Sequence, residues 1–329
     1  MVFIATIGAL FVMLWAFQFP LRSSVHSEPS FSLTGLRDDT RLVGMTEELG
    51  EVDSFRILVW NVARGTEFEQ IVNGLKSVDA HFLILQEVDH RANRSARRDV
   101  AGEIAEALGM GGVFGVEFVE LGQRSGAEPA LHGQTTLSRF PLRSSRILRF
   151  GHQSTFWAPR WYLPHWRWTQ RRLGGRMALV TEHEVNGNLL VTYNLHLESR
   201  SSPSLRTAQL EEILTDAQQY SLDDVVLLAG DFNLDLRQEV PQQMLAQEDF
   251  HCVLELPDAS EDRRLVDWMF VRGAVTWRDG QLRNDIGGSD HIPLVVDFLP
   301  MFRTPPRNVA GDTAPDASAS GKHGQTGGD

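Results

Sequence analysis

Short apolar runs that alternate with helical segments constrain the fold of this chain more than any other sequence feature. The runs are brief, rich in leucine or β-branched residues, and bounded by polar residues or glycine, which is typical of buried strands. They are residues 56–60, 81–86, 189–195, 224–230, 265–271 and 292–298. Apolar residues recur with helical spacing at 67–78, 99–109 and 205–220. Strands interleaved with helices predict a layered α/β architecture.

Polar side chains recur at the ends of these strands. They are Asn61, Glu87, Asn194, His196, Asp231, Asn233, Asp267, Asp290 and His291. One such residue alone is most often a helix cap or a turn residue. Capping and turn roles are a much poorer explanation when polar residues lie at the ends of six strands. Because α/β folds build ligand sites where strand ends face a crevice, the pattern indicates a functional site.

The chain resembles the endonuclease/exonuclease/phosphatase superfamily in the motifs at these strand ends. In family order they are WN (60–61), LQEVD (85–89), TLSRFPL (136–142), YNLHLES (193–199), GDFNLD (230–235), VDWMFV (266–271) and GGSDHIPL (287–294). The superfamily includes deoxyribonucleases, abasic-site endonucleases, sphingomyelinases and inositol-polyphosphate phosphatases. The resemblance implies a four-layer α/β sandwich, in which two mixed β-sheets pack face to face with helices outside.

Hydrolysis of a phosphate ester needs a hard cation, an activated water and stabilisation of the charge that develops on the phosphate. Glu87 is a carboxylate suited to Mg²⁺ or Mn²⁺, which prefer oxygen ligands. The resemblance implies that Glu87 is the principal metal ligand, with Asn61 and Asp290 close by.

The remaining motif residues suit the chemistry at the phosphate. Asp231 can orient and deprotonate the attacking water, and Asn233 can donate to a phosphate oxygen if the segment between them is extended. His291 works best as an imidazolium donor, which Asp267 could hold charged and oriented. The resemblance implies the same Asp–His pairing, and implies that His196 contacts the phosphate.

Three functions fit these residues. The first is a divalent-metal-dependent phosphoesterase that hydrolyses phosphodiester bonds of a nucleic acid. The second is a phospholipid or phosphoinositide phosphohydrolase that works at a membrane surface. The third is an inactive module that binds phosphate, which the presence of Glu87, Asp231 and His291 disfavours. The formal net charge of −12 argues against non-specific coating of nucleic acid, and a single cysteine excludes an intrachain disulfide.

Nine arginines and no acidic residue lie between Glu128 and Glu182, and tryptophan and phenylalanine are interleaved with them at residues 150–172. Arginine with aromatic residues suits nucleic acid, through phosphate contacts and base stacking. It equally suits a membrane surface with anionic lipid. The third alternative is a hairpin that packs on its own domain, with arginine stems covering the rings.

The two ends of the chain differ from its centre. Residues 1–20 are almost wholly apolar, which predicts a hydrophobic anchor or signal segment and a membrane-anchored or exported protein of the bacterial type. Residues 21–54 read as a linker, residues 55–300 as the catalytic domain, and residues 301–329 as a disordered tail. We expect a monomer, and the sequence leaves open which side of the membrane the domain faces.

Several polar residues outside the motifs have ordinary structural interpretations. We interpret Asp89 and Glu184 as solvated acids, and His152, His165 and His183 as surface or loop residues. Arg206 is expected to anchor the helix that begins near residue 205.

Overall fold

The structure is a computed structural model that describes residues 40–46, 49–126, 128–154, 156, 162–164, 168–236, 239–255, 265–278 and 280–299. The predicted N-terminal anchor and the predicted C-terminal tail lie outside these residues, as does most of the segment at 155–167. Among the described residues, no helix has the length and apolar character needed to cross a membrane.

One of the two sheets, sheet A, contains eight strands and mixes parallel and antiparallel pairs. Its order is β1 (Thr40–Gly44), β4 (Gly111–Val119), β5 (Leu131–Ser138), β3 (Phe82–His90), β2 (Phe55–Asn61), β14 (Leu294–Phe298) and β13 (Gln281–Leu282), and β7 (Leu173–Gly174) also pairs with β4. The β2–β3 pair is parallel, so the carboxyl ends of these two strands reach the same edge.

Sheet B contains six strands. Its order is β11 (His251–Cys252), β12 (Asp267–Arg272), β10 (Val225–Asp231), β9 (Asn188–His196), β8 (Met177–Val185) and β6 (Leu142–Arg149). The β9–β10 pair is parallel, as in the other sheet, and β12 runs antiparallel to β10.

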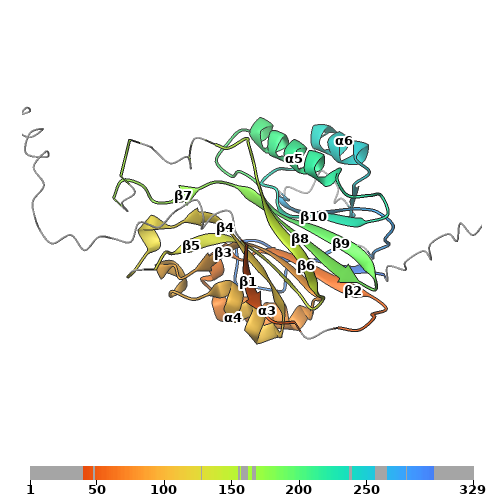
Figure 1. The fold of residues 1–329 in the computed structure, drawn as a ribbon, viewed down its shortest axis with the longest axis horizontal. Coiled ribbons are helices and arrows are strands. Elements are labelled where there is room, and N and C mark those ends of the chain that lie inside the picture. The colour runs from red at the N-terminus through yellow and green to blue at the C-terminus, as the bar shows by residue number, and fades with distance from the viewer. Residues whose placement is uncertain are drawn as a thin grey trace, which may run out of the picture.

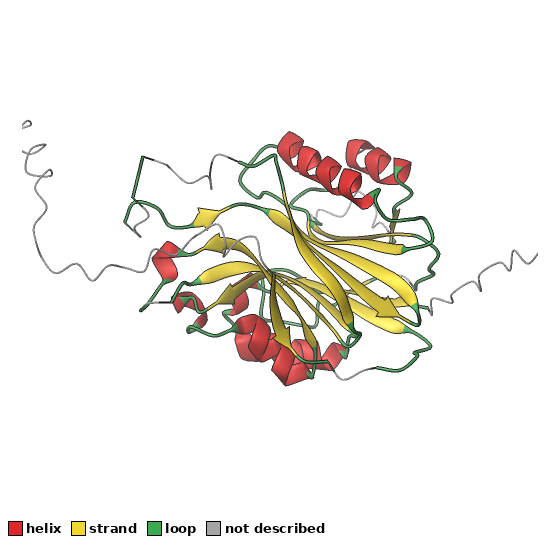
Figure 2. Ribbon diagram, viewed as in Figure 1, coloured by secondary structure: helices red, strands yellow, loops and turns green. Residues whose placement is uncertain are grey.

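Helices cover the outer face of each sheet (Figures 1 and 2). The helices α3 (Phe68–Val78) and α4 (Val100–Leu108) lie against sheet A, while α5 (Pro203–Ala217) and α6 (Glu239–Gln247) lie on the side of sheet B. Short 3-10 turns are present at η1 (Ala63–Gly65), η2 (Asn93–Ser95) and η3 (Leu121–Gln123). The predicted four-layer α/β sandwich with two mixed sheets is confirmed.

Local sequence explains where α4 begins and ends. The Asp99 side chain accepts a hydrogen bond from the amide of Gly102 and so caps the first turn. Gly109 follows the helix in the left-handed conformation, with φ of 62°. A glycine adopts this conformation without a steric penalty, so the chain can leave the helix and enter β4.

The central strands of sheet A, such as β2, β3 and β5, are buried on both faces, which explains the continuous apolar sequences of β2 and β3. In β2, Ile57 and Val59 face the core shared with sheet B, where they join Tyr193 and Leu195 of β9. Leu58 of the same strand belongs instead to the core beneath α3 and α4. All six predicted strands and all three predicted helices are present, with boundaries shifted by a few residues.

The prediction that residues 21–54 form a linker is wrong for residues 40–44. Thr40–Gly44 form the edge strand β1, which pairs with β4 along its whole length. In this strand Leu42 is 78% exposed and Val43 packs against the core. The segment TRLVG has only two large apolar residues, so it does not appear as an apolar run in the sequence.

The predicted solvent exposure of two residues is also wrong. Asp89 in β3 and His183 in β8 are both fully buried. Burial in the core lowers the pKa of His183 to about 4, so this histidine is neutral and structural. Glu184 is exposed and His152 lies in an exposed loop, as predicted, whereas His165 lies outside the described residues.

Candidate active site

Three neighbouring strands of sheet B place three site residues in a row. His196 ends β9 and is directly opposite Asp231, which ends β10. Asp231 is in turn opposite Asp267, the first residue of β12. Side chains at paired positions project to the same face of a sheet. The register of two strand pairs therefore brings together residues from three separate motifs.

Sheet A meets this row through Asn61 at the end of β2. The Asn61 side-chain amide donates to Asp231 Oδ2 at 3.1 Å, and both side chains are buried. The Asn61 Oδ1 atom also accepts from the backbone amide of Ala63, two residues further along the chain. Asn61 therefore has a local hydrogen bond, and it also joins the two sheets at the site.

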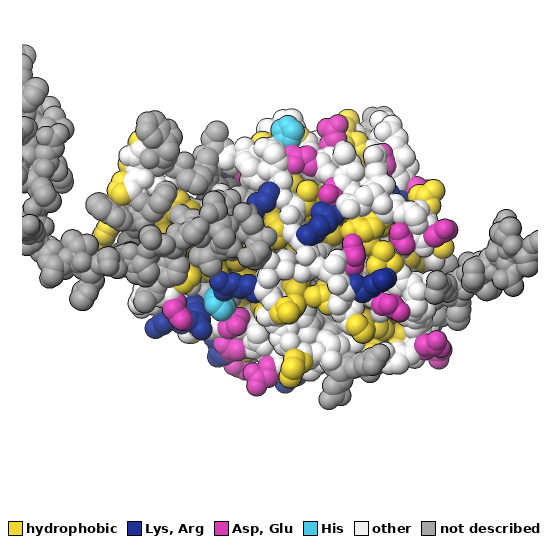
Figure 3. Space-filling view, in the orientation of Figure 1, with side chains coloured by type: hydrophobic (Ala, Val, Ile, Leu, Met, Phe, Trp, Pro, Cys, Tyr) yellow, Lys and Arg dark blue, Asp and Glu magenta, His cyan; other side chains and the backbone are white. Residues whose placement is uncertain are grey.

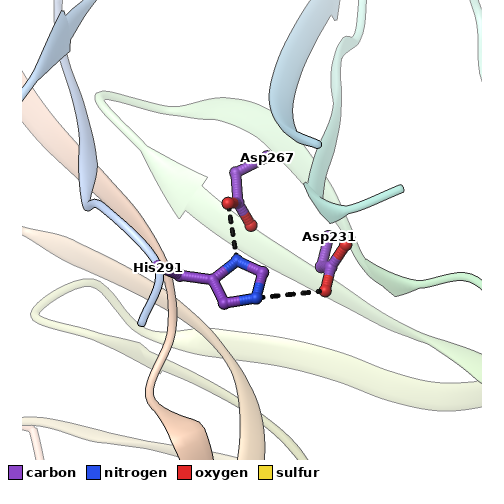
Figure 4. Close-up of side chains that lie close together, drawn as sticks. All are labelled: Asp231, Asp267 and His291. Atoms are coloured by element: carbon purple, nitrogen blue, oxygen red, sulfur yellow. Dashed lines mark hydrogen bonds and ion pairs between the residues drawn. The ribbon is translucent and has the colours of Figure 1, made fainter. Parts of the chain in front are cut away.

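His291 lies in the loop before β14, between the two aspartates (Figure 4). Its Nδ1 atom is 2.7 Å from Asp267 Oδ2, and its Nε2 atom is 3.8 Å from Asp231 Oδ2. Burial alone would lower the pKa of His291, but the hydrogen bond and charge of Asp267, together with Asp231 and Asp290, raise it to about 9. His291 is therefore an imidazolium at neutral pH, as predicted.

Asp231 has an environment that favours its protonated form. The residue is 2% exposed, and burial together with the negative charge of Asp267 raises its pKa to about 7. The neighbouring Asp267 pKa is also raised, chiefly by burial. A carboxyl group with a pKa near neutrality is suited to accept a proton from water.

Glu87 lies in a bulge of β3, where the register with β5 shifts between Leu85 and Val88. Its φ of 49° is unusual for a residue with a side chain, and bulges next to active sites commonly re-aim a side chain in this way. Burial would raise the Glu87 pKa, but His132, Arg64, Arg176 and His291 together lower it, so the carboxylate is ionised.

Two of the predicted metal ligands, Asn61 and Glu87, lie in the neighbouring strands β2 and β3 of sheet A, and Asp290 lies in the loop before β14. Asn61 is paired with Gln86, the residue before Glu87. The hydroxyl of Ser289 donates to the Asn61 carbonyl at 2.6 Å, which ties the loop that carries Asp290 to the end of β2. Asp290 is exposed to solvent and Glu87 is partly exposed. A set of carboxylate and amide oxygens, one of them an ionised carboxylate in a re-aimed bulge, fits Mg²⁺ or Mn²⁺.

A second group of potential ligands is formed by Asp231, Asp267 and His291, whose nearest ligand atoms lie within 4.8 Å of one another. A histidine must be neutral to bind a metal ion, whereas His291 is bonded to Asp267 and its pKa is raised to about 9. Proton transfer therefore suits this group better than metal binding.

His196 is buried and lies in a network of charged residues. Its Nδ1 atom is 2.9 Å from Arg176 Nη1, and its Nε2 atom is 3.6 Å from Asp231 Oδ2. Arg176 also pairs with the buried carboxylate of Glu117 at 3.0 Å. Burial, followed by the charge of Arg176, lowers the pKa of His196 well below its ordinary value. His196 is therefore neutral, whereas His291 is positively charged.

Asn233 departs from its predicted geometry. Its φ is 49°, so the segment after Asp231 turns rather than remaining extended. The Asn233 side-chain amide donates to the Leu197 carbonyl at 3.1 Å, while its backbone amide donates to Asp231 Oδ1 at 2.9 Å. The expected extended segment is wrong, and these contacts show that Asn233 helps to fix the Asp231 carboxylate.

Asp89 belongs to a buried ionic cluster next to the site. Arg94 donates to both oxygens of the Asp89 carboxylate, at 2.7 and 2.6 Å, and His132 Nδ1 lies 2.8 Å from one of them. Arg94 also pairs with Glu120, which pairs with Arg172. Asp89 is thus a structural partner of the strand that carries Glu87, rather than a solvated acid.

Among the described arginines between Glu128 and Glu182, several pair with acids of this domain. The pairs are Arg139 with Asp79, Arg146 with Asp216, Arg172 with Glu120 and Arg176 with Glu117. On the face shown in Figure 3, basic side chains are interspersed with acidic ones. These four arginines form ion pairs within the domain, and only Arg172 of them lies in the segment at 150–172.

Three residues of the site were not singled out from the sequence. Arg64 lies in η1 with φ of 72°, and its guanidinium is 3.3 Å from the Glu87 carboxylate. Glu117 in β4 and Arg176 before β8 support His196. An acid within one apolar strand and an arginine just before another are a weak signal of a buried ion pair. Only the fold shows that this pair contacts His196.

Comparison with known proteins agrees with this geometry. A model of the Endonuclease/Exonuclease/phosphatase family matches residues 58–291, which is more than two thirds of the chain. Among curated proteins, none matches this sequence.

Solved structures with the same fold share little sequence with this chain. An endonuclease/exonuclease/phosphatase from Beutenbergia cavernae has a TM-score of 0.54 at 16% identity, over 76% of this chain and 72% of that chain. The human Nocturnin catalytic domain with bound sulfate has a TM-score of 0.55 at 18% identity, over 79% and 97% of the two chains. The fold, the order of the motifs and the family match agree, and the chain belongs to the endonuclease/exonuclease/phosphatase family.

Proposed function

We propose that this protein is a divalent-metal-dependent phosphoesterase that hydrolyses phosphodiester bonds of a nucleic acid. The observation that carries the proposal is the convergence of His291, Asp267, Asp231 and His196 at one edge of the sandwich, next to Asn61. Family membership supports a hydrolytic phosphoesterase. The diester bond, the metal ion and the nucleic acid substrate are proposed in addition.

The side chains divide the chemistry between them. Asp231 accepts a proton from the attacking water, because its pKa of about 7 lies near working pH. The His291 imidazolium donates to a phosphate oxygen and stabilises the charge that develops there, and Asp267 holds it oriented. His196 is a second donor to the phosphate, and the backbone amide of Asn233 fixes the Asp231 carboxylate.

Glu87, Asn61 and Asp290 would hold the divalent ion at the sheet A side of the site. When bound, the ion supplies Lewis-acid stabilisation of charge on the phosphate oxygens. The partial exposure of Glu87 leaves it accessible to an ion from solvent.

Purified protein tested against plasmid DNA, single-stranded RNA, sphingomyelin vesicles and inositol phosphates, each with Mn²⁺ or Mg²⁺, examines the proposal directly. We expect cleavage of DNA or RNA by the wild-type chain and none by His291→Ala. Activity confined to sphingomyelin or inositol phosphates would contradict a nucleic acid substrate. Metal-dependent phosphate binding without turnover on any substrate would indicate an inactive module.

One observation favours the membrane-surface phosphohydrolase as a second candidate. Phe156, Tyr162 and Trp168, in the Trp- and Arg-rich segment, are 59%, 63% and 81% exposed. Aromatic rings next to arginine suit the headgroup region of a lipid bilayer. A membrane contact through this segment and through residues 1–20 would bring the protein to a surface that contains lipid phosphodiesters.

Substitution of the exposed rings separates the two candidates. We expect Tyr162→Ser combined with Trp168→Ser to abolish hydrolysis of vesicle lipid if the second candidate is correct, while a small soluble chromogenic diester is still cleaved. Unchanged turnover of vesicle lipid in this double variant would contradict the membrane role of the segment.

A further inference from the structure

His196 is enclosed on both sides by charged groups, and the proposed reaction uses only one of its ring nitrogens. Its side chain is 1% exposed. Nε2 faces Asp231 in the site, and Nδ1 faces away from the site toward Arg176. The question is which nitrogen carries the proton.

The chemistry of arginine answers this question. A guanidinium has only N–H donors and no acceptor, and it stays charged at any working pH. The Arg176 Nη1 atom is 2.9 Å from His196 Nδ1, a hydrogen-bond distance. A proton on Nδ1 would therefore direct two N–H groups at each other. Nδ1 must present its lone pair, and the ring proton is left on Nε2.

The nearest alternative partner for Nδ1 does not compete. The Glu117 Oε2 atom is 3.8 Å from Nδ1, beyond hydrogen-bond distance. Its two carboxylate oxygens already accept from Arg176 at 3.0 Å and from the side-chain amide of Gln134 at 2.9 Å. Glu117 therefore acts on Arg176 rather than on His196.

Arg176 has little freedom to move away from the histidine. Its side chain is 4% exposed, and the guanidinium lies over the Phe118 ring, 5.6 Å from the ring centroid. Its second terminal nitrogen donates to the Ser199 hydroxyl at 3.4 Å. A buried cation that is paired and stacked in this way is a fixed donor.

His291 has the opposite arrangement. Its Nδ1 atom faces the carboxylate of Asp267 at 2.7 Å, which requires a proton on Nδ1 and favours the doubly protonated ring. A carboxylate behind one histidine and a guanidinium behind the other give the two rings different proton counts in a single site.

We infer that Arg176 is a positioning residue, which holds His196 as the neutral tautomer with its proton on Nε2. His196 then offers an N–H group to the substrate phosphate without adding a second positive charge beside Asp231. It cannot take the proton of the attacking water at Nε2, since that atom already carries one, so Asp231 remains the acceptor. The inference rests on the proposed function for the contact between His196 and the phosphate.

Nitrogen NMR of the full chain with ¹⁵N-labelled histidine tests the inference without any substrate. Long-range proton–nitrogen correlations distinguish a bare ring nitrogen from a protonated one, and His196→Asn identifies the His196 signals by their loss. We expect a bare Nδ1 and a protonated Nε2 in His196 from mildly acidic to alkaline pH. A protonated Nδ1, alone or together with Nε2, would overturn the inference.

Two substitutions of Arg176 separate its donor character from its packing. Arg176→Lys keeps a cation with donors only, so we expect the same His196 tautomer. Arg176→Gln can present either its carbonyl oxygen or its amide N–H group to Nδ1, so signals of the second tautomer should appear beside those of the first. Arg172→Gln is the matched control, because Arg172 also lies over Phe118, at 4.9 Å, but pairs with Glu120.

The result in Arg176→Gln decides the role of Arg176. An unchanged His196 spectrum in this variant would overturn the inference, because another group would then set the tautomer. If Arg176→Gln does not fold, the wild-type spectrum and that of Arg176→Lys carry the test.

Kinetics link the tautomer to turnover. We expect Arg176→Gln to lower kcat by at least about tenfold with KM nearly unchanged, and Arg176→Lys to recover most of it. A chain with the expected spectrum but no phosphoesterase activity would support the tautomer assignment and contradict the proposed function. Equal kcat in the wild type and in a folded Arg176→Gln with an altered tautomer would overturn the functional part of the inference.

Discussion

At the scale of single residues, the site is a set of ionisable groups whose pKa values are set by their neighbours. Burial and the charge of Asp267 raise the pKa of Asp231 to about 7, and the bond to Asp267 contributes to the rise of the His291 pKa to about 9. The Asp267 carboxylate therefore raises the pKa of both Asp231 and His291. The working form has Asp231 ionised and His291 protonated.

The pH dependence of kcat/KM follows from these two values. Below about pH 7 Asp231 holds its proton, and above about pH 9 His291 loses its own, so activity should rise through the first value and fall through the second. Asp267→Asn removes a negative charge that raises both pKa values, so both limbs should move to lower pH. Asp285→Asn, on the exposed Asp285, should leave both limbs in place. An alkaline limb that does not move in Asp267→Asn would contradict the pairing.

Asp231→Asn tests the base itself. We expect kcat to fall by about 10²- to 10⁴-fold, because an amide cannot accept the proton. The melting temperature at neutral pH should not fall, since a carboxyl with a raised pKa is destabilising when it is ionised in the folded state. The control is Asp223→Asn, at an exposed acid. A large drop in melting temperature would indicate that Asp231 has a structural role instead.

At the scale of elements, the ends of strands β2, β3, β9 and β10 position the site, and their exact separation matters. Gly230, the residue before Asp231, has φ of 143° and lies against the β9 backbone. A Cβ atom at this position would be 2.1 Å from the Leu195 carbonyl oxygen. Only glycine allows β10 to approach β9 closely enough here to place Asp231 beside His196.

Gly230→Ala should therefore reduce both stability and turnover. The backbone must move to accept the methyl group, and we expect a loss of about 1–3 kcal/mol in the free energy of unfolding. Urea unfolding measures the loss, and kcat should fall as Asp231 is displaced. Gly50→Ala is a matched control, because its added Cβ would meet nothing within 4 Å. A variant as stable and active as the control would show that the strands have more freedom than the contact implies.

At the scale of the whole molecule, two sheets with separate sequences form one site. Asn61 from sheet A donates to Asp231 from sheet B, and the side chain of Asn194 bridges the sheets deeper in the core through the Leu85 and Thr135 carbonyls. The predicted metal ligands Asn61 and Glu87 lie on sheet A, whereas the proposed proton acceptor lies on sheet B. The groups proposed to hold the metal and to accept the proton therefore lie close together only in the folded molecule.

Removal of divalent ions should abolish activity, and addition of Mg²⁺ or Mn²⁺ should restore it. Because an ion that binds only the folded chain stabilises it, Mn²⁺ should raise the melting temperature of the wild type. We expect Glu87→Gln to lose most of this rise and most of the turnover, while Glu184→Gln, at an exposed acid of β8, keeps both. Full activity in the presence of EDTA would refute the role of the metal.

The motifs predicted which strand-end residues lie close together, because polar residues at strand ends are visible as interruptions of apolar runs. His291, Asp267, Asp231, His196 and Asn61 are brought together as expected. Supporting residues such as Glu117 were missed, since an acid inside an apolar strand is only a weak local signal. Asp89 was misjudged because burial of an acid depends on partners from other segments, here Arg94 and His132.

The sequence by itself determined the strands, the main helices and the identity of the reactive groups, because hydrophobic periodicity and residue chemistry are local properties. Only the tertiary structure decided the state of each group. The charge of His291, the tautomer of His196 and the pKa of Asp231 depend on neighbours that are distant in sequence. Electrostatic interactions act through space at a few ångströms, and only the packing of the two sheets sets those distances.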